Sequence, residues 1–143
     1  GGAYVATLTA IPYPNGAAKV MHVAEDGTVT DHWTGLTAVT GLALGPDGAL
    51  YAAEMGTDTT EEPPHLPPGS GRIVRQTGPD GAEPVVTGID LPTMVRFAPD
   101  GGLVVAYPAH DTEEGRGALL RIYPEIAPVS LAGIGTLPPT CAG

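Results

Sequence analysis

The sequence predicts an all-β protein, and two observations support this. The chain contains 21 glycines and 16 prolines, together about a quarter of its 143 residues. Each glycine or proline costs on the order of 1 to 3 kcal/mol inside a helix, so long helices are disfavoured. Short runs rich in Val, Leu, Ile, Tyr and Thr recur between Asp-Gly and Pro-Gly pairs, which is the pattern of brief strands joined by turns.

Length and charge exclude several classes of function. A chain of 143 residues is long enough for one domain and too short for two comfortable ones. Sixteen acidic against six basic residues give a net charge of −10, which repels nucleic acid and anionic lipid headgroups alike. No apolar run is long enough for a membrane helix, and the opening "GGAYVATL" lacks the basic start of a signal peptide. We therefore expect a soluble mature chain without nucleic acid or membrane insertion.

A single cysteine, Cys141, stands near the end of the chain. It allows neither an internal disulfide nor a cysteine-based metal cluster. We expect a free thiol on a loose tail, with an intermolecular bridge as the alternative.

A repeat organises the chain. "GLTAVTGLALGPDGAL" from Gly35 aligns without gaps on "GIDLPTMVRFAPDGGL" from Gly88, 53 positions later. A degenerate third copy, "GAYVATL" at 2–8, resembles "ALYAAEM" at 49–55. A second type of strand recurs at 18–27, 71–81 and 117–125. Tandem repetition of this length is typical of propellers and other repeat architectures.

Turn chemistry converts each repeat into a four-stranded meander. In Pro-Asp-Gly the proline fixes φ, the aspartate bonds the backbone locally, and the glycine accepts the positive φ that reverses the chain. One repeat then holds an inner strand "GLALG", its hairpin partner "ALYAAE", a third strand "GRIVRQT" and an outer strand "EPVVTG". Such a meander is the signature of a β-propeller blade.

The chain is therefore predicted to hold about two and a half to three blades, which form an incomplete ring. We expect a partial blade at 1–35, blades at 36–88 and 89–127, and a tail at 128–143 that can supply an outer strand. The first blade begins at its second strand, so we expect a fragment of a larger propeller or a protomer completed by another chain. The alternative is a compact three-sheet domain that tolerates its open edges.

At these residues the chain resembles a known family. "GLTAVTGLALGPDGALYAAEMG", "GSGRIVRQTGPDGAEPVVTGI" and "YVATLTAIPYPNGAAKVMHV" resemble the ScyD/ScyE-type propeller proteins, which are related to NHL-repeat proteins. The resemblance covers residues 1 to about 125. It implies a closed ring in a longer protein, an extracellular or periplasmic location, and no catalytic residues to transfer.

The longest predicted loops should meet on one face, because the loops between second and third strands of all blades emerge on the same side. They span residues 9–17, 56–71 and 108–117. Long loops on a rigid scaffold commonly carry function. Tyr13 lies in the first loop, and acidic residues and histidines fill the other two: Asp58, Glu61, Glu62, His65, His110, Asp111, Glu113 and Glu114.

This acidic face has two interpretations. Clustered carboxylates suit calcium, with Glu54, Asp58, His110 and Asp111 as candidate ligands. The alternative is a solvated acidic rim, through which Tyr13, Glu61, Glu62, His65, Glu113 and Glu114 would contact a partner. His65 lies in "PPHLPP", a stiff segment that can present its ring or dock on an aromatic groove.

The repeat offers structural explanations for other residues. His22, Arg75 and Arg121 occupy the same slot of the third strand, which predicts polar pairing between adjacent blades. Trp33 aligns with Val86 on the outer strand and is predicted to pack in the core. The glycine-rich "GPDG" and "GSGR" stretches are hairpin turns, and neither a phosphate loop nor a serine nucleophile motif is present.

Two classes of function remain. The first is a non-enzymatic extracytoplasmic scaffold that binds protein, either copies of itself or another chain that completes the propeller. The second is a metal-dependent propeller enzyme of the lactonase or sugar-dehydrogenase type, which requires Glu54 and His110 or Asp111 to converge on a metal ion. The inner strands carry Arg96 as their one charged residue, which favours the scaffold.

Overall fold

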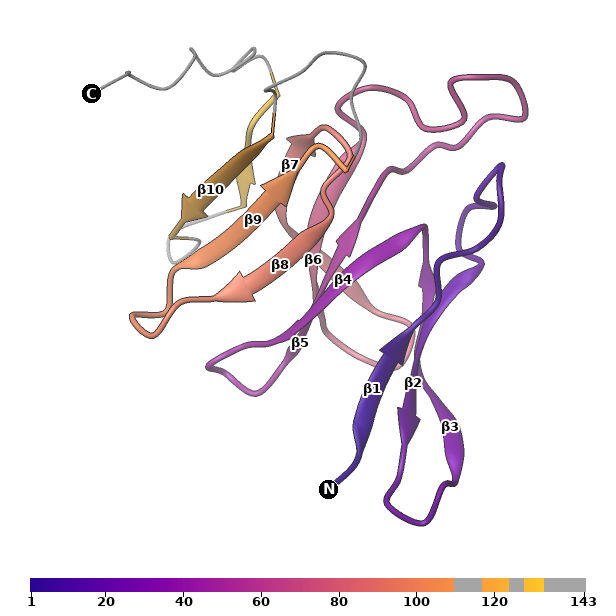
Figure 1. The fold of residues 1–143 in the computed structure, drawn as a ribbon, viewed down its shortest axis with the longest axis vertical. Helices are drawn as coiled ribbons and strands as arrows, with labels where there is room; N and C mark the ends of the chain where they lie inside the picture. Colours follow the sequence, from indigo (N-terminus) through magenta and orange to yellow (C-terminus); the bar gives the residue numbers. More distant parts are fainter. Residues whose placement is uncertain (110–116, 124–127, 133–143) are drawn as a thin grey trace.

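A computed structural model describes residues 1–109, 117–123 and 128–132, and every regular element in these ranges is a strand (Figure 1). The first sheet has the order β1-β2-β3, from β1 (Ala3–Ala6), β2 (Ala18–Val23) and β3 (Val29–Leu36). The second has the order β11-β7-β6-β5-β4, from β4 (Val39–Leu44), β5 (Leu50–Glu54), β6 (Gly71–Gln76), β7 (Ala82–Ile89) and β11 (Val129–Ser130). The third has the order β10-β9-β8, from β8 (Met94–Phe97), β9 (Leu103–Tyr107) and β10 (Ala118–Ile122).

These sheets are consecutive propeller blades, as the sequence predicts. The meander β4 to β7 is antiparallel throughout and runs from inner to outer strand in chain order. Blade 1 is the sheet β1 to β3, blade 2 is built on β4 to β7, and blade 3 is β8 to β10. The inner strands β4 and β8 lie beside each other, and a Cβ on Gly41 would stand only 3.2 Å from the Met94 backbone. In the described residues no helix is long and apolar enough to cross a membrane.

The repeat persists in the backbone dihedral angles. Gly48 and Gly101 close the hairpins β4–β5 and β8–β9 with φ values of 80° and 85°, so the predicted turn geometry is confirmed in these two turns. It is wrong for Pro79-Asp80-Gly81, where Gly81 is not at positive φ. Asp47 and Asp100 each accept a hydrogen bond from the backbone N–H two residues later, at 3.1 Å. Ala38 and Leu91, also 53 positions apart, both lie in the left-handed region, at φ 45° and 46°.

Blade 2 is buried on both of its faces. Tyr51 and Ala53 of β5 pack against Val95, Leu103 and Val105 of blade 3. The alternate residues of the strand, Leu50 and Ala52, pack against a cluster in blade 1 formed by Ala18, Val20, Trp33 and Leu36. Trp33 is fully buried there, which confirms its predicted role in packing. A strand with two buried faces shows no alternation of apolar and polar residues, and all five residues of β5 are buried.

The tail strand β11 lies on blade 2. Val129 and Ser130 pair in parallel with Val86 and Thr87 of β7, and Leu131 N donates to Thr87 O at 2.8 Å. The chain thus runs through blade 3 and returns to the outer edge of the preceding blade. Residues 133–143, including Cys141, lie outside the described residues.

Replacing a turn glycine with valine should destabilise the protein. Gly48→Val and Gly101→Val are each expected to lower the free energy of unfolding by at least about 1 kcal/mol, because a β-branched side chain is strained at positive φ. Urea denaturation measures this loss. Gly78→Val is the matched control, because Gly78, just before Pro79-Asp80-Gly81, is not at positive φ and has open space around its Cβ position. Equal losses at all three positions would contradict the assignment of the hairpins.

Candidate functional site

Two of the long loops lie side by side at one end of the blades. Thr59 N, in the β5–β6 loop, donates to Asn15 Oδ1 in the β1–β2 loop at 3.3 Å. Tyr13 packs against a small apolar cluster of Ala38, Met55 and Leu66. The predicted adjacency of these two loops is therefore confirmed. Most of the third loop, with His110, Asp111, Glu113 and Glu114, lies outside the described residues.

The β5–β6 loop is held together by its own hydrogen bonds. Thr60 N donates to His65 O at 2.9 Å, and the Thr60 hydroxyl contacts the carbonyl oxygens of Glu62 and Pro64. His65 Nδ1 lies 3.1 Å from Thr60 O, so its ring is fixed against the loop. Asp58, Glu61 and Glu62 are exposed, which leaves their carboxylates in water.

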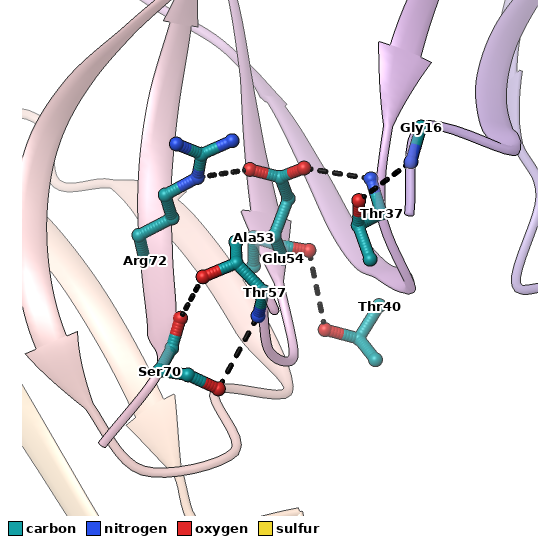
Figure 2. Close-up of polar contacts among 8 residues, drawn as sticks. All are labelled: Gly16, Thr37, Thr40, Ala53, Glu54, Thr57, Ser70 and Arg72. Atoms are coloured by element: carbon teal, nitrogen blue, oxygen red, sulfur yellow. Dashed lines mark hydrogen bonds and ion pairs between the residues drawn. The ribbon is translucent and has the colours of Figure 1, made fainter. Parts of the chain in front are cut away.

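The base of the loop is closed by two polar contacts. Thr57 N donates to Ser70 Oγ at 3.2 Å, and the Thr57 hydroxyl donates to Ser70 O at 3.1 Å (Figure 2). The two ends of the loop are therefore pinned where β5 stops and β6 starts.

Glu54 is the central charged group of this end of the protein. It is the last residue of β5 and is fully buried. Its Oε2 accepts a hydrogen bond from Arg72 Nε at 2.5 Å, and its Oε1 accepts one from Thr37 N at 2.7 Å (Figure 2). A buried carboxylate is tolerated only when it is paired and hydrogen-bonded in this way.

Hydrogen bonds near Glu54 join the three blades. Thr37 lies between β3 and β4, and its hydroxyl accepts a hydrogen bond from Gly16 N of the β1–β2 loop at 2.9 Å. Thr40 of β4 donates to Pro92 O, ahead of β8, at 2.7 Å. Hydrogen bonds therefore join blade 1 to Glu54, and Thr40 of blade 2 to the start of blade 3, at the end that carries the long loops.

Backbone strain gathers at this end. The non-glycine residues in the left-handed region are Tyr13, Ala38, Asp58 and Leu91, and each lies in a loop at the Glu54 end of the blades. Such conformations persist only where the surrounding structure holds them, and they are commonly found at functional sites.

The predicted metal ligands are only partly placed. Glu54 is engaged by Arg72 and Thr37, and Asp58 is exposed in its loop. Across residues 1–109, 117–123 and 128–132, no three His, Cys, Asp or Glu side chains lie close enough together to hold a metal ion. A cation at Glu54 would have to displace Arg72. The calcium site with His110 and Asp111 stays a prediction.

The opposite end of the blades carries a repeated ion pair. Arg75 Nε donates to Asp47 Oδ2 at 2.6 Å, and Arg121 pairs with Asp100 in blade 3. The pairing predicted between adjacent blades is wrong: each arginine binds the turn aspartate of its own blade, because the hairpin brings the turn beside the third strand. The hydrogen bond from Arg121 holds the pKa of Asp100 at about 2.

Arg72 and Thr37 are residues of the candidate site that sequence reasoning missed. The signal for Arg72 was present in the strand register, because pairing Tyr51 with Arg75 places Arg72 opposite Glu54. Thr37 also follows from the register in part, because Val39, two residues later, is paired with Glu54 across the β4–β5 hairpin.

Comparison with known proteins supports the fold. No protein-family model matches the chain, and no curated protein matches it. Among solved structures it is similar to a luciferin-regenerating enzyme, with a TM-score of 0.57, 15% identity, and coverage of 88% of this chain and 39% of that one. It is also similar to a candidate gluconolactonase, with a TM-score of 0.48, 15% identity, and coverage of 76% of this chain and 32% of that one. The chain thus spans less than half the length of either protein.

Removing one partner of the Glu54–Arg72 pair should be costly. Glu54→Met is expected to lower the free energy of unfolding by roughly 2 to 4 kcal/mol, because it strands the buried Thr37 N–H and the Arg72 guanidinium. Arg72→Met should cost at least as much, since it leaves a buried carboxylate without its counter-ion. The double variant should cost clearly less than the sum of the two, as measured by chemical denaturation. Additive losses would show that the two side chains do not interact.

Proposed function

We propose that this chain forms part of a β-propeller enzyme of the lactonase or sugar-dehydrogenase kind, with its ligand site at the Glu54 end of the blades. The proposal revives the alternative left open by the sequence. Its support from the comparisons is that the chain shares its fold with a luciferin-regenerating enzyme.

The observation that carries the proposal is the placement of Glu54. A fully buried carboxylate, tied to Arg72, lies directly beneath two packed loops that expose Asp58, Glu61 and Glu62. Residues in strained conformations lie in the loops at the same end of the blades. Buried charges and strained loops gather at catalytic sites more often than elsewhere.

The role of Glu54 in such a site is positional. Because its oxygens are held by Arg72 and Thr37, it fixes the Arg72 guanidinium and the entry to β4. Of the three exposed carboxylates of the loop, that of Asp58 is nearest along the chain to Glu54, and we assign it the contact with a ligand or a cation. Calcium, if bound, would take oxygen ligands of this kind and would polarise a carbonyl or hydroxyl group of the substrate.

Activity and calcium binding test the proposal together. The full chain should hydrolyse an aldonolactone in a proton-release assay with calcium, and calcium should raise its melting temperature, because a ligand bound only by the native state stabilises it. Asp58→Asn should reduce the rate at least about tenfold, while asparagine still accepts the left-handed backbone. Asp80→Asn, at the opposite end of the blades, is the control and should keep the rate. No hydrolysis above background, or full activity in Asp58→Asn, would overturn the proposal.

A second candidate is supported by the outer faces of the described blades. Val5 and Val29 on blade 1 are 43% and 56% exposed, and Leu119 on blade 3 is 70% exposed. Exposed apolar side chains on blade faces call for neighbouring blades. We infer an extracellular or periplasmic propeller module of the ScyD/ScyE type, which binds copies of itself or another chain through these faces.

Light scattering tests this second candidate. The module should behave as a discrete multiple of the 14.4 kDa chain, or co-purify with a second protein. A stable, monodisperse species with the mass of one chain would contradict assembly. Addition of salt should leave the multiple intact, because the faces are apolar and salt screens only charges.

A further inference from the structure

The edge of β1 is open. β1 pairs with β2 along one side, and in the described residues no strand pairs with its other side. β5 and β9 hold the same second place in their blades and are paired on both sides. Because Thr7 N donates to Lys19 O, the alternation of antiparallel strands points the N–H groups of Tyr4 and Ala6 toward the open side.

The neighbouring blades show what such an edge receives. β5 is paired with β4, which leads into the turn at Asp47, and β9 is paired with β8, which leads into the turn at Asp100. In each case the turn aspartate crosses to the third strand and binds an arginine, Arg75 or Arg121. A tyrosine hydroxyl also contacts the aspartate at 3.2 Å, from Tyr51 in blade 2 and Tyr123 in blade 3.

Blade 1 holds the donor half of the same arrangement. Tyr4 is opposite His22, as Tyr51 is opposite Arg75. The Tyr4 ring lies 5.2 Å from the His22 ring and 4.7 Å from the His32 ring, centroid to centroid. In the described residues neither the Tyr4 hydroxyl nor the His22 ring contacts a carboxylate, although both are hydrogen-bond donors.

The backbone beside this slot also matches. A Cβ on Gly2 would stand 2.6 Å from His22 Nε2, and a Cβ on Gly102 would stand 3.0 Å from Arg121 Nε. Both glycines therefore let the chain pass close to the His22 or Arg121 side chain of the third strand. His22 thus occupies the position that Arg75 and Arg121 occupy in the other blades, with an imidazole in place of the guanidinium.

We propose that the open edge of β1 binds an antiparallel β-strand that ends in an aspartate, whose carboxylate accepts hydrogen bonds from His22 and Tyr4. Main-chain hydrogen bonds to β1 supply the affinity, as in other cases of strand addition. The aspartate fixes the register, because it meets its donors in only one alignment. The proposal deepens the assembly function and names the partner: a strand of the β4 kind.

A synthetic peptide tests the chemistry directly. The probe has the sequence of residues 37–47, "TAVTGLALGPD", with a fluorescent label and a C-terminal amide, and its binding to the full chain is followed by anisotropy. His22→Arg should tighten binding at least about threefold, because a guanidinium makes a stronger pair with a carboxylate than an imidazole does. The same peptide ending in asparagine should bind more weakly and should not respond to His22→Arg.

N-methylation of the peptide separates strand addition from other contacts. Because Gly45 N donates to Ala49 O, the N–H of Ala43 also faces the partner strand and that of Leu44 faces away. An N-methyl group at Ala43 should abolish binding, and one at Leu44 is the matched control and should preserve it.

Three results would overturn the proposal. The first is no binding at about 1 mM peptide, which is the weak limit of specific association. The second is equal binding of the two N-methylated peptides. The third is equal affinity for the aspartate and asparagine peptides in both the original protein and His22→Arg. A monomeric chain in light scattering would remove the assembly function and leave this test standing, since the peptide is added in excess.

Discussion

The structure depends on burying both faces of blade 2. Alternate residues of β5 point in opposite directions, so Tyr51 and Ala53 belong to the core shared with blade 3, and Leu50 and Ala52 to the core shared with blade 1. A small sheet gains little stability alone, and each blade here draws its core from a neighbour. This packing also positions Glu54. Its side chain is on the same face of β5 as Leu50 and Ala52, which is the face turned toward blade 1.

The two ends of the blades are built differently. At one end, the turns at Gly48 and Gly101 use glycine for positive φ, and the turn aspartates Asp47 and Asp100 are each paired with an arginine of their own blade. At the other end, long loops carry non-glycine residues at positive φ around a buried carboxylate. The first end therefore sets the register of the strands, while the second holds a buried ion pair beneath exposed acidic loops. This asymmetry places the candidate site at the loop end.

The sequence predicted the local elements well and the contacts between blades less well. Strands and hairpins follow from Pro-Asp-Gly chemistry and apolar runs, which act over a few residues, and the repeat extended them along the chain. The partners of Arg75 and Arg121 were wrong because an alignment assigns a slot without saying which side of the slot faces a charge. The parallel pairing of β11 with β7 joins segments more than 40 residues apart in sequence, and no local pattern encodes it. His110, Asp111, Glu113 and Glu114 stay predictions, because they lie outside the described residues.

The pairing of β11 with blade 2 couples the unfolding of blade 3 to that of blade 2. In a simple string of repeats, the terminal unit can peel away while the rest remains folded. Here Val129 and Ser130 pair with β7. Blade 3 is therefore connected to the sheet of blade 2 at both ends, through the chain that follows β7 and through β11. Blade 3 cannot separate from blade 2 unless the hydrogen bonds between β11 and β7 break first. Local unfolding of blade 3 is therefore coupled to loss of the β11–β7 pairing, so blades 2 and 3 are expected to open together.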